Sequence, residues 1–335
     1  MLAGDSEIHG AVLNNDISAV EELLKNKTDV NISDKCGRTV LHLAASYNSP
    51  LTQKLLSLPN ADANKTDDVL KWTPLRYADR TKSWMAMNIL LQNGTKPDDI
   101  VLTKSKSEAR EWEQRALWQC TSKGHRKLLE FLLNCGYDVN AVVEVPENQQ
   151  VKYTLFHRAS FGGQTEVVRI LFNRRSDINI RTAKSHTALH LAAESGSVDI
   201  IKLLLDEGMS VNLTNTNGNS PLHFSALLGK LEATKTLVER GAALNDTNIY
   251  GNTPLMLAAF KSESEIFRYL TKSGADINIC DKNDDSALHL NITNKYGNTP
   301  LMVAALRGKT EVFLYLKENG ANIGIRSNDN DIGLH

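Results

Sequence analysis

Residues 187–212 read TALHLAAESGSVDIIKLLLDEGMSVN, and copies of this stretch recur along the chain of 335 residues. The leucine of the TALH opening returns at one constant interval, as Leu189, Leu222, Leu255 and Leu288. A fixed period of this length indicates a repeat architecture, in which each unit buries its apolar face against its neighbours. We therefore expect a stack of similar units rather than two globular domains.

Each copy predicts two short helices joined by a turn. Ser220 offers a hydroxyl that caps the first helix, and Pro221 follows in the first turn, where its missing N–H does no harm. Gly196 ends the first helix of the quoted copy, because glycine accepts the left-handed conformation. Val198 and Ile201 then begin a second helix with helical spacing. Helices this short are marginal in water alone, so the stack has to be the folding unit.

The openings, the alanine pairs and the closing glycines follow one pattern. Two openings come close to T-P-L-H, namely Ser220-Pro221-Leu222-His223 and Thr253-Pro254-Leu255-Met256. Pairs such as Ala192-Ala193 keep the first helix thin, and Gly208 closes a unit. With these residues the chain resembles the ankyrin repeat family over almost its whole length. The resemblance implies an all-α solenoid of about nine stacked helix–turn–helix units with β-hairpin-like loop tips. It also implies that the histidine of each opening makes hydrogen bonds that brace the loop between units.

The register predicts a single array over residues 1–335. Its expected repeats are 4–33, 34–67, 68–103, 104–145, 146–182, 183–215, 216–248, 249–281 and 294–328. The spacing of the equivalent residues shows an excess of nine residues, placed in the polar stretch 96–110, which we interpret as an elongated connection. A second excess, of six residues, falls in residues 142–152.

The period fails near the C-terminal end. Leu301 follows Leu288 by less than half of the period, so residues 282–293 are expected to form an overlong loop or a truncated repeat. Residues 329–335 begin an incomplete repeat, which suggests a fragment of a longer chain.

Bulk composition favours a reduced intracellular protein with no charge bias. The 38 basic and 39 acidic residues give no preference for nucleic acid or an anionic membrane. No apolar run approaches the length of a membrane span, so we expect no membrane insertion. The four cysteines are scattered, which fits reduced thiols better than a disulfide framework. We expect a cytoplasmic location, with the nucleus as the alternative.

The sequence offers no constellation for catalysis, for a metal or for a cofactor. It lacks the phosphate-loop, dinucleotide, zinc-protease and serine-hydrolase motifs. Seven of the nine histidines fall at the fourth place of an opening, and one histidine per repeat cannot converge on one ion. The segment 112–118, with Trp112 and Trp118 beside Arg110 and Arg115, could indicate nucleic-acid binding, but packing of a degenerate helix is the better interpretation. We expect no enzyme activity, no small-molecule substrate and no nucleic-acid partner.

One set of positions predicts a binding surface. In ankyrin arrays the two positions after the alanine pair face the concave side, and the first of them is apolar in most of the later repeats of this chain. The expected partner-binding residues are Phe161, Leu227, Leu228, Phe260 and Leu306, with Tyr250 and Tyr296 at the loop tips. Glu194 occupies the same position in the intervening repeat. The alternative is that these side chains fold inward and fill the core.

The expected function is a non-catalytic scaffold that binds another protein. A rigid stack holds side chains from several repeats in place, so little conformational entropy is lost on docking. The alternative is a substrate-recognition or linker segment of a larger protein, such as a ubiquitin-ligase adaptor or a cytoskeletal linker.

Overall fold

The computed structural model of the 335-residue chain describes residues 7–26, 28–47, 49–96, 106–145, 148–261, 263–279, 301, 304–305, 308 and 310–321. The chain forms two compact units, Met1–Ala141 and Val142–His335, which are described in turn.

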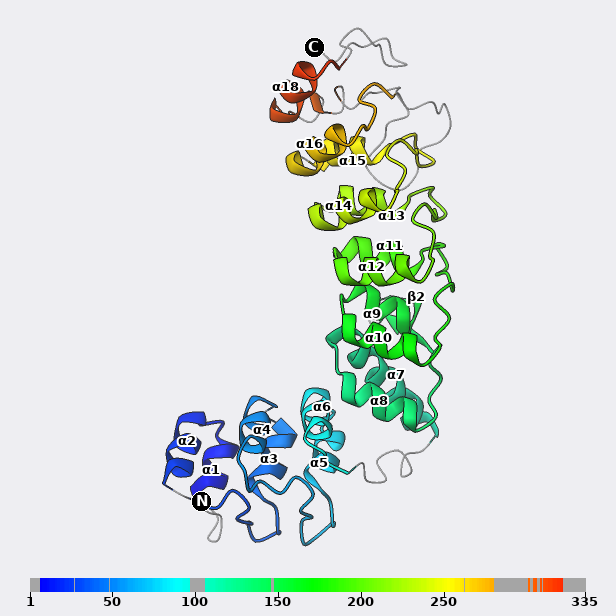
Figure 1. The fold of residues 1–335 in the computed structure, drawn as a ribbon. Coiled ribbons are helices and arrows are strands. Elements are labelled where there is room, and N and C mark those ends of the chain that lie inside the picture. The colour runs from blue at the N-terminus through cyan, green and yellow to red at the C-terminus, as the bar shows by residue number, and fades with distance from the viewer. Residues whose placement is uncertain are drawn as a thin grey trace. The chain divides into compact units, whose positions relative to one another are not determined.

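The first unit consists of four helix pairs (Figure 1). In chain order they are α1 (Glu7–Leu13) with α2 (Ile17–Lys25), α3 (Val40–Tyr47) with α4 (Ser49–Leu56), α5 (Pro74–Arg80) with α6 (Trp84–Gln92), and α7 (Lys106–Lys123) with α8 (Arg126–Asn134). The first helices α1, α3 and α5 pack side by side, and the second helices α4, α6 and α8 form a parallel layer beside them. Each helix thus packs against the other helix of its pair, and successive pairs pack against each other.

The second unit repeats this arrangement after a short hairpin. The strands β1 (Val142–Val145) and β2 (Asn148–Thr154) are followed by α9 (Leu155–Phe161) with α10 (Thr165–Asn173), α11 (Ala188–Ser195) with α12 (Val198–Asp206), α13 (Pro221–Leu227) with α14 (Leu231–Glu239), α15 (Pro254–Lys261) with α16 (Ser264–Lys272), and α18 (Thr310–Glu318). First helices α9, α11, α13 and α15 pack in sequence, as do second helices α10, α12, α14 and α16.

The first helices begin where the T-P-L-H openings predict. Ser220 and Thr187 each form a capping box with the histidine three residues later. Thr73 caps α5, whose first residue is Pro74. In these three helices the start is marked by residues of the opening itself.

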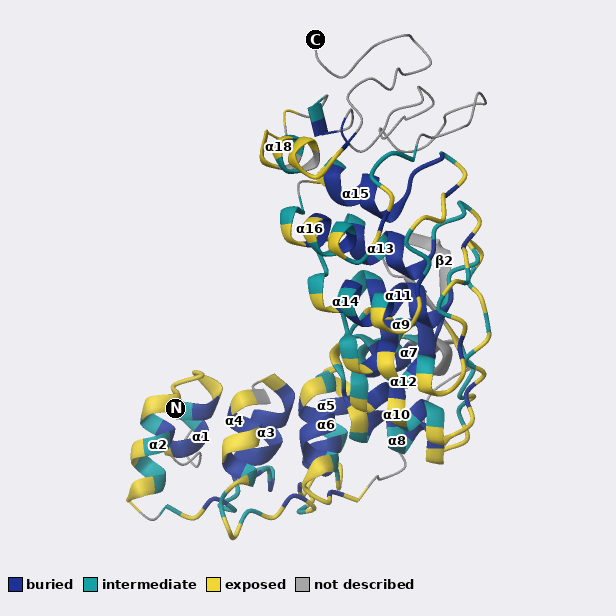
Figure 2. Ribbon diagram, turned by 45° about the horizontal axis from the view of Figure 1, so that its top comes forward, coloured by how far each residue is buried: buried dark blue, intermediate teal, exposed yellow. Residues whose placement is uncertain are grey.

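The core lies where the two helix layers and successive pairs meet. The repeated leucine of the openings is fully buried at Leu189, Leu222 and Leu255. The pair Ala192-Ala193 is equally buried, which lets the first helices approach closely. Helices α3, α11 and α15 are buried over most of their length (Figure 2), whereas the second helices keep one exposed face.

The stretch expected to be an elongated connection is partly helical. Residues 106–110, which were predicted to belong to this connection, instead form the start of α7, an 18-residue helix. Trp112 of this helix is buried, its indole N–H donates to the Asp79 carboxylate at 2.6 Å, and its ring lies 5.7 Å from that of Trp84. Asp79 replaces the second residue of an alanine pair. Trp112 is therefore a packing residue, and the prediction of core packing for it is confirmed.

The excess in residues 142–152 forms part of the β1–β2 hairpin. The two strands are antiparallel, with Val142 opposite Thr154 and an irregularity between Glu144 and Val145. The strand β2 runs directly into α9, so that Thr154 is both the last residue of the hairpin and the N-cap of the helix. The sequence predicted the extra residues but not this conformation.

Some predictions concern residues outside the described parts. They are the overlong loop at 282–293, the incomplete repeat at 329–335, and the side chains of Tyr296 and Leu306. The boundaries of the nine repeats stay a prediction.

Candidate functional site

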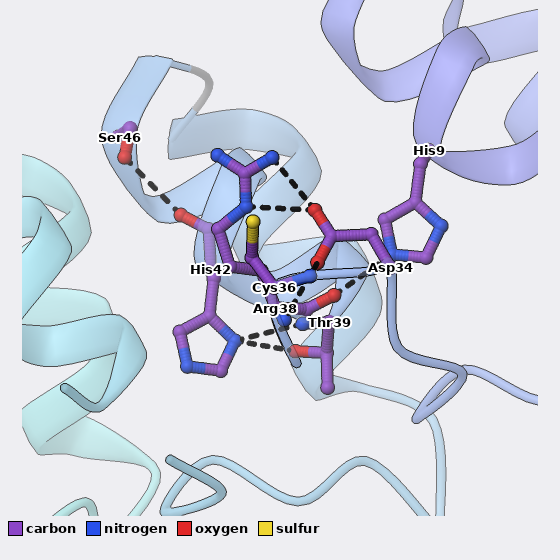
Figure 3. Close-up of polar contacts among 7 residues, drawn as sticks. All are labelled: His9, Asp34, Cys36, Arg38, Thr39, His42 and Ser46. Atoms are coloured by element: carbon purple, nitrogen blue, oxygen red, sulfur yellow. Dashed lines mark hydrogen bonds and ion pairs between the residues drawn. The ribbon is translucent and has the colours of Figure 1, made fainter. Parts of the chain in front are cut away.

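Several loop tips in the described part of the chain are closed by a short polar side chain that accepts hydrogen bonds from its own turn. Asp34 Oδ1 accepts from the backbone N–H groups of Cys36 at 2.8 Å and Arg38 at 2.9 Å (Figure 3). Asn215 and Asn248 do the same in the second unit. This is the turn that Asp and Asn favour, because the side chain replaces a backbone acceptor. The tips are thus ordered locally by one residue per repeat.

In four openings of the described repeats, the histidine ties its helix to the tip of the following repeat. His42 Nδ1 accepts from the Thr39 backbone N–H at 3.0 Å (Figure 3), which leaves the proton on Nε2. Nε2 then donates to the Trp72 carbonyl oxygen at 3.0 Å. Equivalent bonds run from His9 to Arg38 at 2.9 Å, from His190 to Asn219 at 3.0 Å and from His223 to Asn252 at 3.1 Å. We call these bonds the histidine brace.

All four histidines are buried, and the pKa is lowered in three of them. Burial lowers the pKa of His190 and of His223 to about 4 in each case. Burial also lowers the pKa of His42. In each of these three residues both ring nitrogens are occupied by hydrogen bonds within the fold, so the imidazole has no free nitrogen for proton transfer or for a metal.

His157 departs from this pattern. Its Nδ1 lies 2.9 Å from the Thr154 hydroxyl, but its buried Nε2 has no hydrogen-bond partner of good geometry. Burial lowers its pKa to about 4. His157 is also the histidine whose opening follows the β1–β2 hairpin: its N-cap residue Thr154 is the last residue of β2 and is paired with Val142.

The predicted partner-binding residues of the first helices are partly exposed. Phe161 is 37% exposed and Leu228 is 40% exposed, while Leu227 and Phe260 are half-buried. We call these four residues the apolar row. Phe161, Leu227 and Phe260 lie at equivalent places at the C-terminal ends of α9, α13 and α15, and Leu228 follows Leu227 directly as the C-cap of α13. The row is therefore neither buried as core nor fully exposed, and its outer surface is open to solvent.

Cations stand over two rings of the apolar row. The Arg158 guanidinium carbon lies 5.4 Å from the centre of the Phe161 ring, and Lys261 Nζ lies 5.9 Å from that of Phe260. Such contacts favour one orientation of both partners. They show that the exposed rings sit in a mixed apolar and basic surface.

Glu194 occupies the same register position between Phe161 and Leu227. It is half-buried in α11, and burial raises the pKa of its carboxyl group. Its negative charge raises the pKa of Tyr153, after the larger effect of that tyrosine's own burial. The sequence placed Glu194 in the row but gave no sign that its carboxylate is shielded from water.

The loop tips expose apolar residues in addition to the predicted Tyr250. Tyr250 is half-buried, and its backbone N–H donates to Asn248 Oδ1 at 3.0 Å. Its neighbour Ile249 is 50% exposed, and Val69 and Leu70 are 67% and 52% exposed at a tip of the first unit. Sequence reasoning missed these three aliphatic residues, although their tip positions were a usable signal.

Metal sites and membrane-spanning helices are absent from the part of the chain that the structure describes. The described residues include no group of three or more His, Cys, Asp or Glu side chains arranged to hold a metal ion. Among the same residues, no helix combines the length and the apolar character needed to cross a membrane. Burial raises the pKa of the Cys120 thiol, which makes this cysteine a poor nucleophile.

A family comparison agrees with this geometry. The family described as ankyrin repeats (3 copies) matches residues 8–101, 117–215, 156–248, 189–281 and 244–327. These overlapping matches cover well over half of the chain. Ankyrin repeats are generally modules for protein–protein interaction and are typically non-catalytic. The chain therefore belongs to the ankyrin repeat family, and its fold is the all-α ankyrin solenoid.

Proposed function

We propose that this chain is a non-catalytic scaffold that binds a partner protein through the apolar row and the neighbouring loop tips. The surface comprises Phe161, Leu227, Leu228 and Phe260, and the tip residue Tyr250. By their register, Leu306 and Tyr296 extend the same surface. The partner is a protein, with no role for nucleic acid, a small-molecule substrate or a cofactor.

The observation that carries this proposal is the exposure of apolar side chains at the two adjacent register positions that follow the alanine pair. Phe161 at the first of these positions and Leu228 at the second are each more than one-third exposed, and they come from repeats that are two apart. Exposed apolar side chains are ordinary when scattered, but their alignment across stacked helices is typical of a binding surface. Aromatic residues such as Phe161 and Tyr250 are also the kind that contributes strongly to interfaces.

The fold supports binding by holding this surface rigid. Helix α13 of the row is capped by Ser220, and its His223 is bonded to the next repeat; α11, which packs between α9 and α13, is held in the same way by Thr187 and His190. The tip at Tyr250 is closed by Asn248. A surface that is ordered before binding loses little entropy on docking, which strengthens binding without adding contacts.

Paired substitutions test the proposal. Phe161→Ala combined with Leu228→Ala removes the two most exposed side chains of the row, so the thermal midpoint should change little. Capture of partners from a lysate, quantified by mass spectrometry, should fall at least tenfold, because buried interface anchors commonly contribute about 2 kcal/mol or more. Met85→Ala is the control, since Met85 is 47% exposed but lies on the second helix α6.

Two outcomes would count against this surface. If the double variant captures the same proteins as strongly as Met85→Ala does, the row is not the binding surface. If its thermal midpoint falls sharply and capture falls only in proportion, then the row belongs to the core. The variant Tyr250→Ala reports separately on the tip.

A further inference from the structure

Glu194 places a charged side chain at a register position that is apolar in the repeats before and after it. It lies one repeat after Phe161 and one repeat before Leu227, at the end of α11. Helix α11 packs against α9 on one side and against α13 on the other. A single carboxylate thus stands between two apolar side chains, each contributed by an adjacent helix.

Several other carboxylates of the second unit form ion pairs, whereas Glu194 does not form one with any residue that the structure describes. Asp206 lies 2.7 Å from Arg240, and Glu232 lies 2.7 Å from Lys235. Arg158, on the adjacent helix α9, has its guanidinium over the Phe161 ring. Glu194 is therefore half-shielded from water, and no cation of the described residues compensates for the lost hydration.

Binding of a purely apolar partner would increase the desolvation penalty of the Glu194 carboxylate. Covering the row would strip the remaining water from Glu194, and burying a carboxylate without a partner is strongly unfavourable. A cationic side chain placed against Glu194 removes this penalty, and the low local polarity strengthens the attraction. The carboxylate thus selects among the partners that the apolar row would otherwise accept.

We propose that Glu194 binds a Lys or Arg side chain of the partner, in a segment where apolar residues on either side of that base contact Phe161 and the Leu227–Leu228 pair. This inference rests on the proposed function of the apolar row and specifies the partner's chemistry. The complementary segment carries one positive charge between apolar residues. Charge supplies the specificity, while the apolar contacts supply most of the affinity.

A random peptide library displayed on phage tests the inference with the full chain as bait. Wild-type protein should enrich peptides with Lys or Arg between apolar residues. The Glu194→Gln variant keeps the shape of the side chain and removes its charge, so it should retain the apolar preference and lose the basic one. Glu239→Gln is the matched control, because Glu239 is an exposed glutamate at the end of the second helix α14, away from the row. It should select the same peptides as wild type.

A selected peptide then allows a charge-swap measurement by fluorescence anisotropy. Glu194→Gln should weaken binding at least tenfold, and so should replacing the peptide's base with Gln. The two changes together should weaken it little more than either alone, because each removes the same interaction. Glu194→Lys should bind a peptide in which Glu replaces the base better than it binds the original. Equal selection by wild type and Glu194→Gln, or additive losses in the cycle, would overturn the inference.

The two proposals can fail separately. If Phe161→Ala with Leu228→Ala weakens peptide binding but Glu194→Gln does not, only the role of Glu194 is wrong. If the double variant binds the selected peptides as wild type does, or if wild type enriches no peptide at all, the apolar row itself is not the binding surface and both proposals fall.

Discussion

The indole N–H of Trp112 donates a hydrogen bond of 2.6 Å to the carboxylate of Asp79, a residue of the preceding repeat. Both residues are buried. Asp79 takes the place of the second alanine in its repeat, so a polar group lies where a stack of this kind normally has a methyl group. The larger side chain of α7 supplies a donor at that place. One departure from the repeat pattern is thus compensated by another in the following repeat.

Trp112→Phe should destabilise the first unit. The substitution removes the indole N–H that donates to the buried Asp79 side chain. Loss of such a donor typically costs about 1–3 kcal/mol of unfolding free energy. Trp84→Phe is the control, because it shrinks an adjacent ring whose indole makes no hydrogen bond to the described residues. Adding Asp79→Ala to Trp112→Phe should recover part of the loss, since it restores the alanine pair. Urea unfolding measures all four proteins, and a double variant less stable than Trp112→Phe would contradict this account.

Gly37→Ala should destabilise more than Gly94→Ala. Both glycines are left-handed, with φ of +76° and +77°, so alanine is strained at either place by roughly 1–2 kcal/mol. A Cβ at Gly37 would also lie 2.5 Å from the backbone nitrogen of Asp68, whereas one at Gly94 would meet no atom within 4 Å. The excess loss in thermal unfolding therefore measures how tightly the tips at Gly37 and Asp68 are packed. Equal losses would mean that the tip of the next repeat moves aside freely.

Stability should fall with acid in the window set by the braced histidines. The pKa of His190 and of His223 is lowered to about 4, below the ordinary value near 6.5, so the unfolded chain binds more protons between these limits. Their contribution is complete above pH 6.5 and is lost as the pH falls towards 4. Each group should contribute a slope of up to about 1.4 kcal/mol per pH unit.

The pH slope should follow the number of braced histidines. Met256 stands at the equivalent place in another repeat, so His190→Met with His223→Met introduces a side chain that the fold already tolerates there. This variant should be less stable at pH 7.5, but its stability should depend less on pH between 7 and 5. Urea unfolding across that range provides the measurement. An unchanged slope would show that other groups dominate acid unfolding.

Amide hydrogen exchange should be slower in residues 187–274 than in residues 39–140. The later repeats match the pattern without insertions, whereas the earlier ones contain Asp79 in place of an alanine and the extra residues near 96–110. In a linear stack, weak contacts lower local stability without unfolding distant repeats. Uniform protection along both segments would contradict this prediction.

The sequence predicted what depends on the period of the repeats. The buried leucines and the capped helix starts follow from local signals that recur from repeat to repeat, as at Leu189 and Thr187. Insertions carry no such register. The spacing of equivalent residues gave the number of extra residues, but it could not distinguish a loop from the helical start of α7 or from the β1–β2 hairpin.

The candidate site was predictable in position but not in character. Register alone placed Phe161, Glu194 and Leu227 in one row. How far each side chain is exposed depends on neighbours contributed by other repeats and on cations such as Arg158. Shielding of the Glu194 carboxylate is a property of three packed helices, and no single repeat contains it.

The histidine brace also bears on how such a chain can change in length during evolution. Every acceptor of the brace is a main-chain carbonyl, and the residues that provide it are as different as Arg38, Trp72, Asn219 and Asn252. The donor therefore places no demand on the side chain of the repeat that follows. A duplicated or deleted unit meets its new neighbour with this junction already satisfied, so whole repeats can be gained or lost without a compensating mutation at the brace.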